Sequence, residues 1–150
     1  SGNPLRIDRC RMKYLVDANV LSEVTKPEPH PAVVRWLRRH ERFIAVTPII
    51  LGEIEYGIGL TTSARRRNAL KRWFAEGLQR LKVCDLDADT ASTWAALLVR
   101  LRKSGKAMPV KDSLIAASAL QHQLTIVTRN ISDFQNAEVP LLNPFELTAD

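Results

Sequence analysis

The feature that most constrains the fold of this chain is a series of short apolar runs separated by segments of helical length. The runs are YLV at 14–16, FIAVT at 43–47, LKVCDL at 81–86, LTIVT at 124–128 and VPLLN at 139–143. Strands that alternate with helices are typical of an α/β fold with a mainly parallel sheet. The sequence therefore predicts a central, mainly parallel sheet of four to five strands.

Capping residues and prolines set the expected ends of the intervening helices. Thr47 followed by Pro48 is an N-cap with proline at the first helical position, which predicts a helix to about Leu60. The other expected helices span residues 31–39, 63–80, 87 or 89–103, and 109–123. The sequence contains no repeat, low-complexity tract or linker, and its 150 residues are the usual size of one domain. We predict a single domain over residues 12–150, preceded by an N-terminal extension, residues 1–11, that opens Ser-Gly-Asn like a cloning scar or processed end.

Charge and cysteine content narrow the classes of partner and compartment. The net charge of +6 and the pI of about 9.7 favour a polyanion such as nucleic acid, or else reflect a solvated basic surface. Cys10 and Cys84 lie far apart, so reduced thiols are expected rather than a disulfide. The most apolar region, residues 43–60, contains a proline and two glutamates and does not suit a membrane span. We expect a cytoplasmic protein without a membrane partner.

Polar and acidic side chains follow the ends of two predicted strands. Asp17 comes directly after the first apolar run, and Asn130 and Asp133 follow the fourth. A buried charge is costly unless something binds it. In open α/β sheets, ligands bind outside the carboxyl ends of the strands. These strand ends are therefore the predicted location of a site.

Three further acids lie on the predicted helices. Glu53 and Glu55 have similar apolar neighbours at helical spacing, so spacing alone does not choose between them. Asp112 follows Pro109 by three residues and falls in a first helical turn, where the helix dipole favours a carboxylate by about 0.3–1 kcal/mol. Each acid alone is compatible with an ordinary cap or ion pair. A cluster of them needs a cation, and an all-oxygen ligand set favours Mg²⁺ or Mn²⁺ over zinc.

Five motifs, in this order and spacing, resemble those of the PIN-domain ribonucleases, in particular the VapC-type toxins of type II toxin–antitoxin pairs. They are VDANVLSE around Asp17, LGEIEYGI around Glu53, PVKDSLIAASAL around Asp112, TIVTRNISDF around Asn130, and the closing LLNPF. The resemblance extends from Tyr14 to Phe145. It implies a three-layer α/β/α PIN-like fold around the predicted sheet.

The resemblance also implies an activity and its residues. In this family the matching acids bind Mg²⁺ or Mn²⁺ and hydrolyse single-stranded or looped RNA, such as tRNA or rRNA loops, leaving a 5′-phosphate and a 3′-hydroxyl. It selects Glu53 over Glu55 and makes Asp17, Glu53 and Asp112 the implied metal ligands and catalytic residues. Translation would be inhibited by the cleavage.

The fourth acidic position of the family is where this chain departs from the pattern. Asn130 fills that position, and Asp133, three residues on, is the nearest carboxylate. Both remain candidate catalytic residues. Asn19 matches the polar residue that commonly follows the first acid by two.

Basic residues near these motifs are candidates for contact with the RNA backbone. The candidates are Arg65, Arg66, Lys106, Lys111 and Arg129. Binding through such residues weakens steeply with salt. Lys111 stands immediately before Asp112, where it either contacts phosphate or is simply exposed.

The resemblance implies a homodimer, and a higher assembly with a cognate VapB-like antitoxin whose tail enters the acidic groove. Val33, Val34 and Trp36 are candidates for such an interface, although core packing explains them equally well. The alternative function is a catalytically weak or inactive PIN module that acts by RNA binding or antitoxin docking, since the fourth acid is replaced. A phosphatase of the haloacid dehalogenase type would need a second Asp where Asn19 stands, and no nucleophile-elbow motif supports a serine or cysteine hydrolase.

Overall fold

The computed structural model describes residues 12–148, in which five strands form one parallel sheet. The strands are β1 (Tyr14–Val16), β2 (Ile44–Val46), β3 (Lys82–Val83), β4 (Thr125–Val127) and β5 (Leu141–Leu142). Their order in the sheet is β3-β2-β1-β4-β5, and every neighbouring pair is parallel. The predicted parallel sheet is confirmed at the upper end of its expected strand number.

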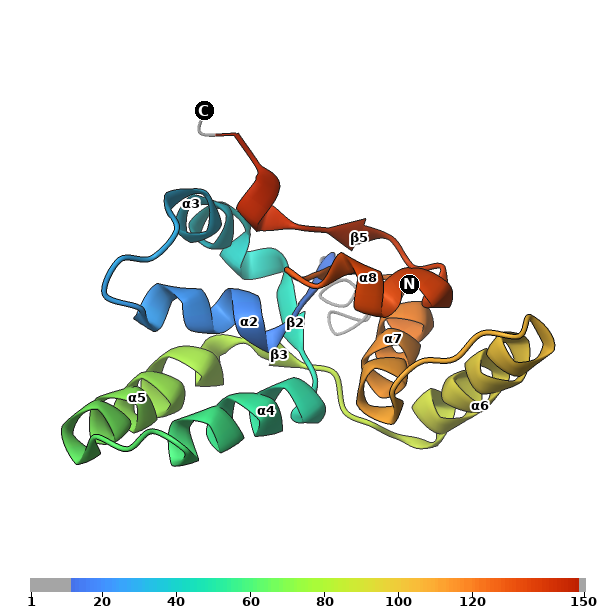
Figure 1. Cartoon of the computed structure of the whole chain (residues 1–150), viewed down its shortest axis with the longest axis horizontal. Helices are drawn as coiled ribbons and strands as arrows, with labels where there is room; N and C mark the ends of the chain where they lie inside the picture. The colour runs from blue at the N-terminus through green and yellow to red at the C-terminus, as the bar shows by residue number, and fades with distance from the viewer. Residues whose placement is uncertain (1–11, 149–150) are drawn as a thin grey trace, which may run out of the picture.

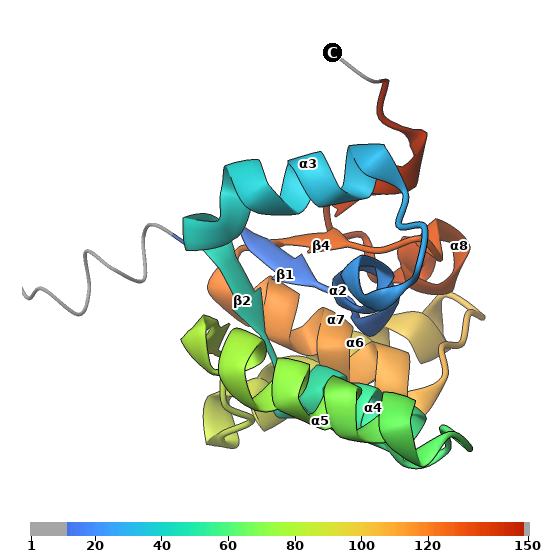
Figure 2. The ribbon, with the colours of Figure 1, turned by 90° about the vertical axis from the view of Figure 1, so that its left-hand side faces the viewer.

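Helices cover both faces of the sheet. The α-helices are α2 (Ala18–Leu21), α3 (Pro31–His40), α4 (Pro48–Gly59), α5 (Ala64–Gly77), α6 (Ala88–Lys103), α7 (Val110–His122) and α8 (Ile131–Phe134). Short 3₁₀ turns are η1 (Ser22–Thr25), η2 (Glu41–Phe43), η3 (Leu78–Arg80), η4 (Gln135–Ala137) and η5 (Pro144–Glu146). Figure 1 shows this arrangement, and Figure 2 shows α3 on one side of β1, β2 and β4 with α4 to α7 on the other. The expected three layers are therefore present.

Side-chain caps explain why the predicted starts of α4, α5 and α6 agree with the structure. The Thr47 hydroxyl accepts a hydrogen bond from the N–H of Ile50 (3.2 Å) and starts α4, as predicted. Ser63 caps α5 in the same way, and Asp87 forms a capping box with Thr90 at the start of α6. The predictions differ elsewhere: β3 and β5 are only two residues long, and the four-residue helices α2 and α8 were not predicted.

The core lies around the three central strands. Leu15 and Val16 of β1 and Ile126 and Val127 of β4 have no solvent exposure, which is typical of parallel strands covered on both faces. Val33 and Trp36 of α3 are buried in this same core. Val34, the third candidate on α3, is half-buried. Of the two readings offered for Val33 and Trp36, the structure therefore supports core packing.

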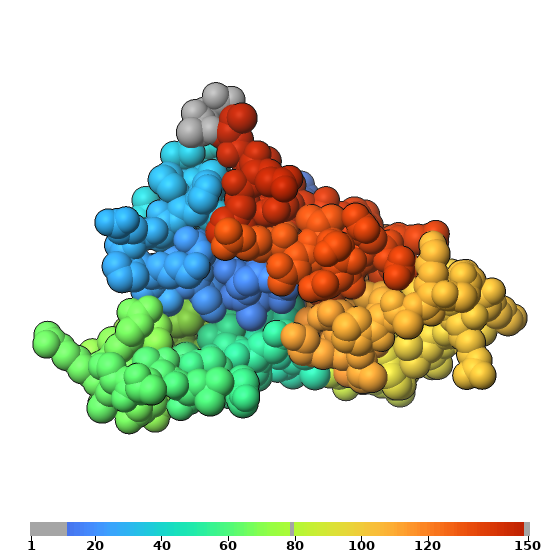
Figure 3. Space-filling model, in the orientation of Figure 1, coloured from blue at the N-terminus to red at the C-terminus, as the bar shows by residue number. Residues whose placement is uncertain are grey.

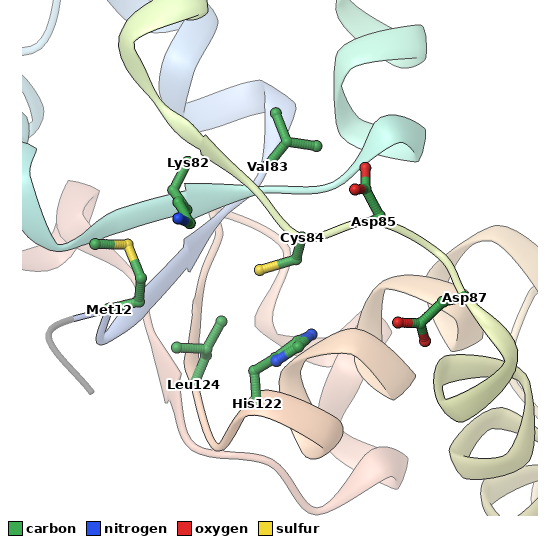
Figure 4. A pocket seen from close by; sticks show the side chains of 8 residues that line it. All are labelled: Met12, Lys82, Val83, Cys84, Asp85, Asp87, His122 and Leu124. Atoms are coloured by element: carbon green, nitrogen blue, oxygen red, sulfur yellow. The ribbon is translucent and has the colours of Figure 1, made fainter. Parts of the chain in front are cut away.

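A pocket of about 360 Å³ lies beside β3, next to the segments that precede β1 and β4 (Figure 4). It is lined by Cys84, His122 and Leu124, and by Asp85 and Asp87, which come after β3 in the sequence. Cys10 and the predicted extension 1–11 lie outside the described residues. Between residues 12 and 148, the structure contains no helix with the length and apolarity to cross a bilayer.

Burial predicts which leucines carry stability. Leu15→Ala removes a fully buried side chain from the central strand and is expected to lower the free energy of unfolding by about 2–5 kcal/mol. The matched change Leu60→Ala, at a residue 63% exposed, should cost less than about 0.5 kcal/mol. Urea denaturation followed by circular dichroism measures both. Equal losses for the two variants would contradict the position of the core.

Candidate active site

Asp17 stands where β1 ends and α2 begins. Its backbone N–H continues the sheet by donating to the carbonyl of Val127 (2.8 Å), and its carboxylate caps α2 by accepting from the N–H of Ala18 (2.8 Å). The residue is only 7% exposed. The burial of Asp17 predicted from the sequence is therefore confirmed, and the turn into α2 fixes its backbone at the carboxyl edge of the sheet.

The second carboxylate oxygen of Asp17 joins the ends of β1 and β4. Thr128, directly after β4, donates its hydroxyl to Oδ2 (2.8 Å), and Asn19 donates its amide nitrogen to the same oxygen (3.2 Å). Asn19 also accepts from the N–H of Arg129 (3.1 Å), and the Thr128 hydroxyl accepts from the N–H of Asn130 (3.0 Å). These bonds hold the Asp17 carboxylate in one orientation.

Thr128 was not singled out in the sequence, although it is fully buried and contacts Asp17 directly. One sequence signal was present: Thr128 follows β4 as Asp17 follows β1, and those strands are neighbours in the sheet. The residue type gave no further indication, because threonine at the end of a β-branched run fits a strand equally well.

Glu53 lies on the face of α4 that is turned toward α7, a helix with which α4 is in contact. Its Oε2 accepts a hydrogen bond from the ammonium of Lys111 (2.9 Å). Its Oε1 is buried and has no hydrogen-bond partner. Glu55 is exposed, so the structure separates the two glutamates that helical spacing left equivalent.

Asp112 lies in the first turn of α7 and is 9% exposed. Burial raises the pKa of its carboxyl, and the negative charges of Asp133, Asp17 and Glu53 raise it further against the opposing effect of Lys111. The other acids expected at the site therefore all act on the pKa of Asp112.

The two candidates for the fourth acidic position lie at α8. Asp133, in the first turn of this helix, is exposed and contributes to the raised pKa of Asp112. Asn130 is exposed as well, and its backbone N–H supports Thr128. The Asn130 side chain forms no cap on α8.

The elements that carry these residues form a continuous set on one face of the molecule. Helix α2 contacts α4, α4 contacts α7, and α7 contacts α8. Figure 3 shows the blue α2 region, the green-blue α4 and the orange α7 and α8 meeting in the middle of this face. The acids therefore stand on elements that contact one another, although within residues 12–148 no three acidic, histidine or cysteine side chains converge closely enough to form a ready metal site.

The residues present fit a hard divalent cation. The donors are carboxylates and an amide, which suit Mg²⁺ or Mn²⁺. The buried Oε1 of Glu53 is an acceptor without a donor, and such an atom costs about 1–3 kcal/mol unless a partner meets it. A cation held by these residues would be a partner for that oxygen.

The basic candidates occupy different positions around this face. Arg65 and Arg66 are exposed in the first turn of α5, and Arg66 donates to the carbonyl of Thr25 in η1 (3.1 Å). Lys106 is exposed in the loop before α7. In the described part of the chain, Lys111 is the one of the five that forms an ion pair with a site carboxylate.

Arg129 packs against the C-terminal part of the chain. Its guanidinium lies over the ring of Phe145, 4.5 Å from the ring centre. The ring of Phe145 in turn meets that of His30 edge to face, at 5.5 Å between centres. The motif LLNPF thus supports the segment that follows β4, which carries Thr128.

Glu23, within the first motif, is a buried acid that the sequence reading passed over. Its Oε2 accepts from the N–H of His30 (2.9 Å), and its Oε1 pairs with Lys26 (3.0 Å). Burial works against ionisation, but these bonds outweigh it and lower the pKa of the Glu23 carboxyl. Glu23 therefore fixes the connection between η1 and α3 rather than adding to the acidic cluster.

Comparison with known proteins assigns the family. The family described as PIN domain matches residues 14–139. This chain belongs to the PIN domain family. The resemblance drawn from the five motifs is confirmed.

Relatives of this PIN domain match along nearly their whole length. It is 31% identical to VapC ribonuclease Y4jK of Sinorhizobium fredii over 136 residues, which is 88% of this chain and 97% of that protein. It is 30% identical to toxin FitB of Neisseria gonorrhoeae over 135 residues, which is 87% of this chain and 97% of that protein. The likeness to VapC-type toxins is thereby confirmed as well.

Solved structures agree with the fold. FitAcB from Neisseria gonorrhoeae superposes with a TM-score of 0.83 at 30% identity, covering 89% of this PIN domain and 99% of that chain. VapBC2 from Rickettsia felis, bound to a DNA fragment from its promoter, gives a TM-score of 0.74 at 25% identity and covers 88% and 98%. The three-layer PIN fold is confirmed.

The Thr128 hydroxyl yields a prediction about stability. Thr128→Val keeps the shape but removes the donor to the buried Asp17 carboxylate, which should lower the free energy of unfolding by about 1–3 kcal/mol. Thr128→Ser keeps the hydroxyl and should recover most of that loss. Urea denaturation at neutral pH measures both. Equal stability of Thr128→Val and the unmodified protein would show that this hydrogen bond does not hold Asp17.

Proposed function

We propose that this PIN domain is a divalent-metal-dependent endoribonuclease toxin that a cognate antitoxin neutralises. The observation that carries the proposal is the set of carboxylates gathered at the carboxyl edge of the sheet, with Asp17 and Asp112 both buried. The relatives named VapC ribonuclease and toxin FitB support the same function.

Asp17, Asp112 and Glu53 would hold the metal, with Mg²⁺ favoured and Mn²⁺ an alternative. When bound, the ion would supply an activated water and neutralise charge on the phosphate that is attacked. The protein contributes fixed ligands: Thr128 and Asn19 orient Asp17, and the fold keeps Asp112 out of water.

Of the two candidates for the fourth acidic position, we assign Asp133. The charge of its carboxylate raises the pKa of Asp112, so the two acids are close enough to interact. The carboxylate is also open to solvent, so it is available to accept a proton or a hydrogen bond from a water at the mouth of the site. Asn130 instead serves through its backbone, which donates to Thr128.

RNA is the substrate class that the charge of the molecule favours. The net charge of +6 draws a polyanion, and Arg65, Arg66, Lys106 and Arg129 are the proposed backbone contacts. The proposed targets are loops of tRNA or rRNA, cut to leave a 5′-phosphate and a 3′-hydroxyl. One relative at 26% identity, from Salmonella typhimurium, is named tRNA(fMet)-specific endonuclease VapC.

A VapB-like antitoxin and a second copy of this chain are the proposed protein partners. The names of the matching structures support the antitoxin, since one is FitAB bound to IR36 DNA and another is a member of the VapBC family of toxin–antitoxin systems. We propose that the chain forms a homodimer and that the homodimer enters a higher assembly with the antitoxin.

Loss of the buried acids should abolish cleavage. Asp17→Asn and Asp112→Asn should each lower the rate with Mg²⁺ or Mn²⁺ on the order of a hundredfold or more, because even the outer partners of metal ligands are worth 10–100-fold. Asp89→Asn, at an exposed acid in the first turn of α6, should retain the rate. The assay is gel analysis of a tRNA and rRNA pool, with and without EDTA.

Cleavage that survives EDTA, or both site substitutions, would contradict the proposed nuclease and indicate a contaminating enzyme. Tight RNA binding without cleavage under either metal would favour the alternative of an inactive PIN module. End mapping of the products tests the expected 5′-phosphate.

The two neighbouring glutamates provide a matched pair. Glu53→Gln should lower the cleavage rate at least about tenfold, because its carboxylate faces Lys111 and the other acids. Glu55→Gln, on an exposed face of the same helix, should leave the rate within about twofold of the unmodified protein. Initial rates at saturating metal measure both. The reverse result would show that the site uses the other face of α4.

A further inference from the structure

We propose that Lys111 is a built-in competitor of the divalent cation at Glu53, so that the ion binds against the positive charge of the ammonium. The inference rests on the proposed metal site and adds to it a residue that sets how readily the site is filled. Sequence reasoning had left Lys111 as either a phosphate contact or an exposed lysine.

The contact between Lys111 and Glu53 joins two helices. The ammonium of Lys111, in the first turn of α7, donates to Oε2 of Glu53 on α4 at 2.9 Å, across 58 residues of sequence. The Lys111 side chain is 52% exposed and that of Glu53 is 26% exposed. The lysine therefore reaches in from solvent and covers a partly buried carboxylate.

Lys111 also lies in the field of the other acids. It immediately precedes Asp112 in the sequence, and its ammonium is paired with Glu53. A lysine ammonium is positively charged at neutral pH. It offsets part of the repulsion among carboxylates that the fold has brought together.

The same carboxylates are the proposed ligands of the metal, so the two cations compete. Oε2 of Glu53 is engaged by Lys111, while Oε1 is buried without a partner. An ion that binds Glu53 either displaces the ammonium or remains beside it and is repelled by it. Both cases weaken metal binding relative to a site without Lys111.

Displacement has a consequence for the substrate. Because Lys111 is half-exposed and adjacent to Asp112, an ammonium released from Glu53 stays at the mouth of the acidic site. There it is free to contact a phosphate of the RNA backbone. Filling the site with metal would thus provide a positive charge for the substrate.

The test measures Mn²⁺ affinity of the full chain by isothermal titration calorimetry, without RNA. Lys111→Met keeps the length of the side chain and removes its charge, and it should bind Mn²⁺ about tenfold more tightly, equal to about 1.4 kcal/mol. Lys111→Arg keeps a competing cation and should remain within about twofold of the unmodified protein. The control is Lys103→Met, which removes the same charge from an exposed position at the end of α6 and should change nothing.

Thermal unfolding gives a second readout that does not depend on activity. Without added metal, Lys111→Met should melt at a lower temperature, because Glu53 loses its ion-pair partner. Saturating Mn²⁺ should raise its melting temperature by more than that of the unmodified protein. If Lys111→Met fails to fold, Lys111→Gln replaces it with the same expected results.

The outcomes separate this inference from the proposed function. Unchanged Mn²⁺ affinity in Lys111→Met overturns the competition, and weaker affinity overturns it by showing that Lys111 positions Glu53 as a ligand. If neither the unmodified protein nor any variant binds Mn²⁺, the proposed metal site itself is wrong. Tighter binding in Lys111→Met, absent in Lys103→Met, supports the inference.

Discussion

The site depends on a buried carboxylate where the neighbouring strands β1 and β4 end. Asp17 ends β1, starts α2 and accepts from Thr128 after β4, so one side chain connects three elements. A charge that is 7% exposed is tolerated because hydrogen bonds reach both of its oxygens. The parallel order β1–β4 makes this possible, since it places the residues after both strands at the same edge.

Electrostatics extend this local constraint to the helices. Asp112 and Glu53 come from α7 and α4, which contact one another, and Lys111 of α7 pairs with Glu53. In the proposed metal site, the ammonium that pairs with Glu53 would be the charge against which a divalent cation binds. Stability and metal affinity are opposed in such a site, because whatever neutralises the carboxylates in the folded protein has to be replaced when the ion binds.

Local patterns in the sequence were sufficient for the strands and for the starts of helices α3 to α7. Thr47-Pro48 predicted the start of α4 because a cap is a contact between residues three apart. Helix α2 was not predicted, because the apolar residues after Asp17 continue the strand pattern.

Long-range contacts explain the rest of what sequence reasoning missed. The bond from Thr128 to Asp17 spans 111 residues and the pair Lys111–Glu53 spans 58, so neither has a local signature. Helical spacing alone left Glu53 and Glu55 equivalent, and their different exposure in the fold separates them.

The most direct test of the central claim is anomalous X-ray diffraction from crystals soaked in Mn²⁺. The account predicts a manganese peak bounded by Asp17, Glu53 and Asp112, whereas a peak confined to another part of the molecule, or none at saturating Mn²⁺, would contradict it.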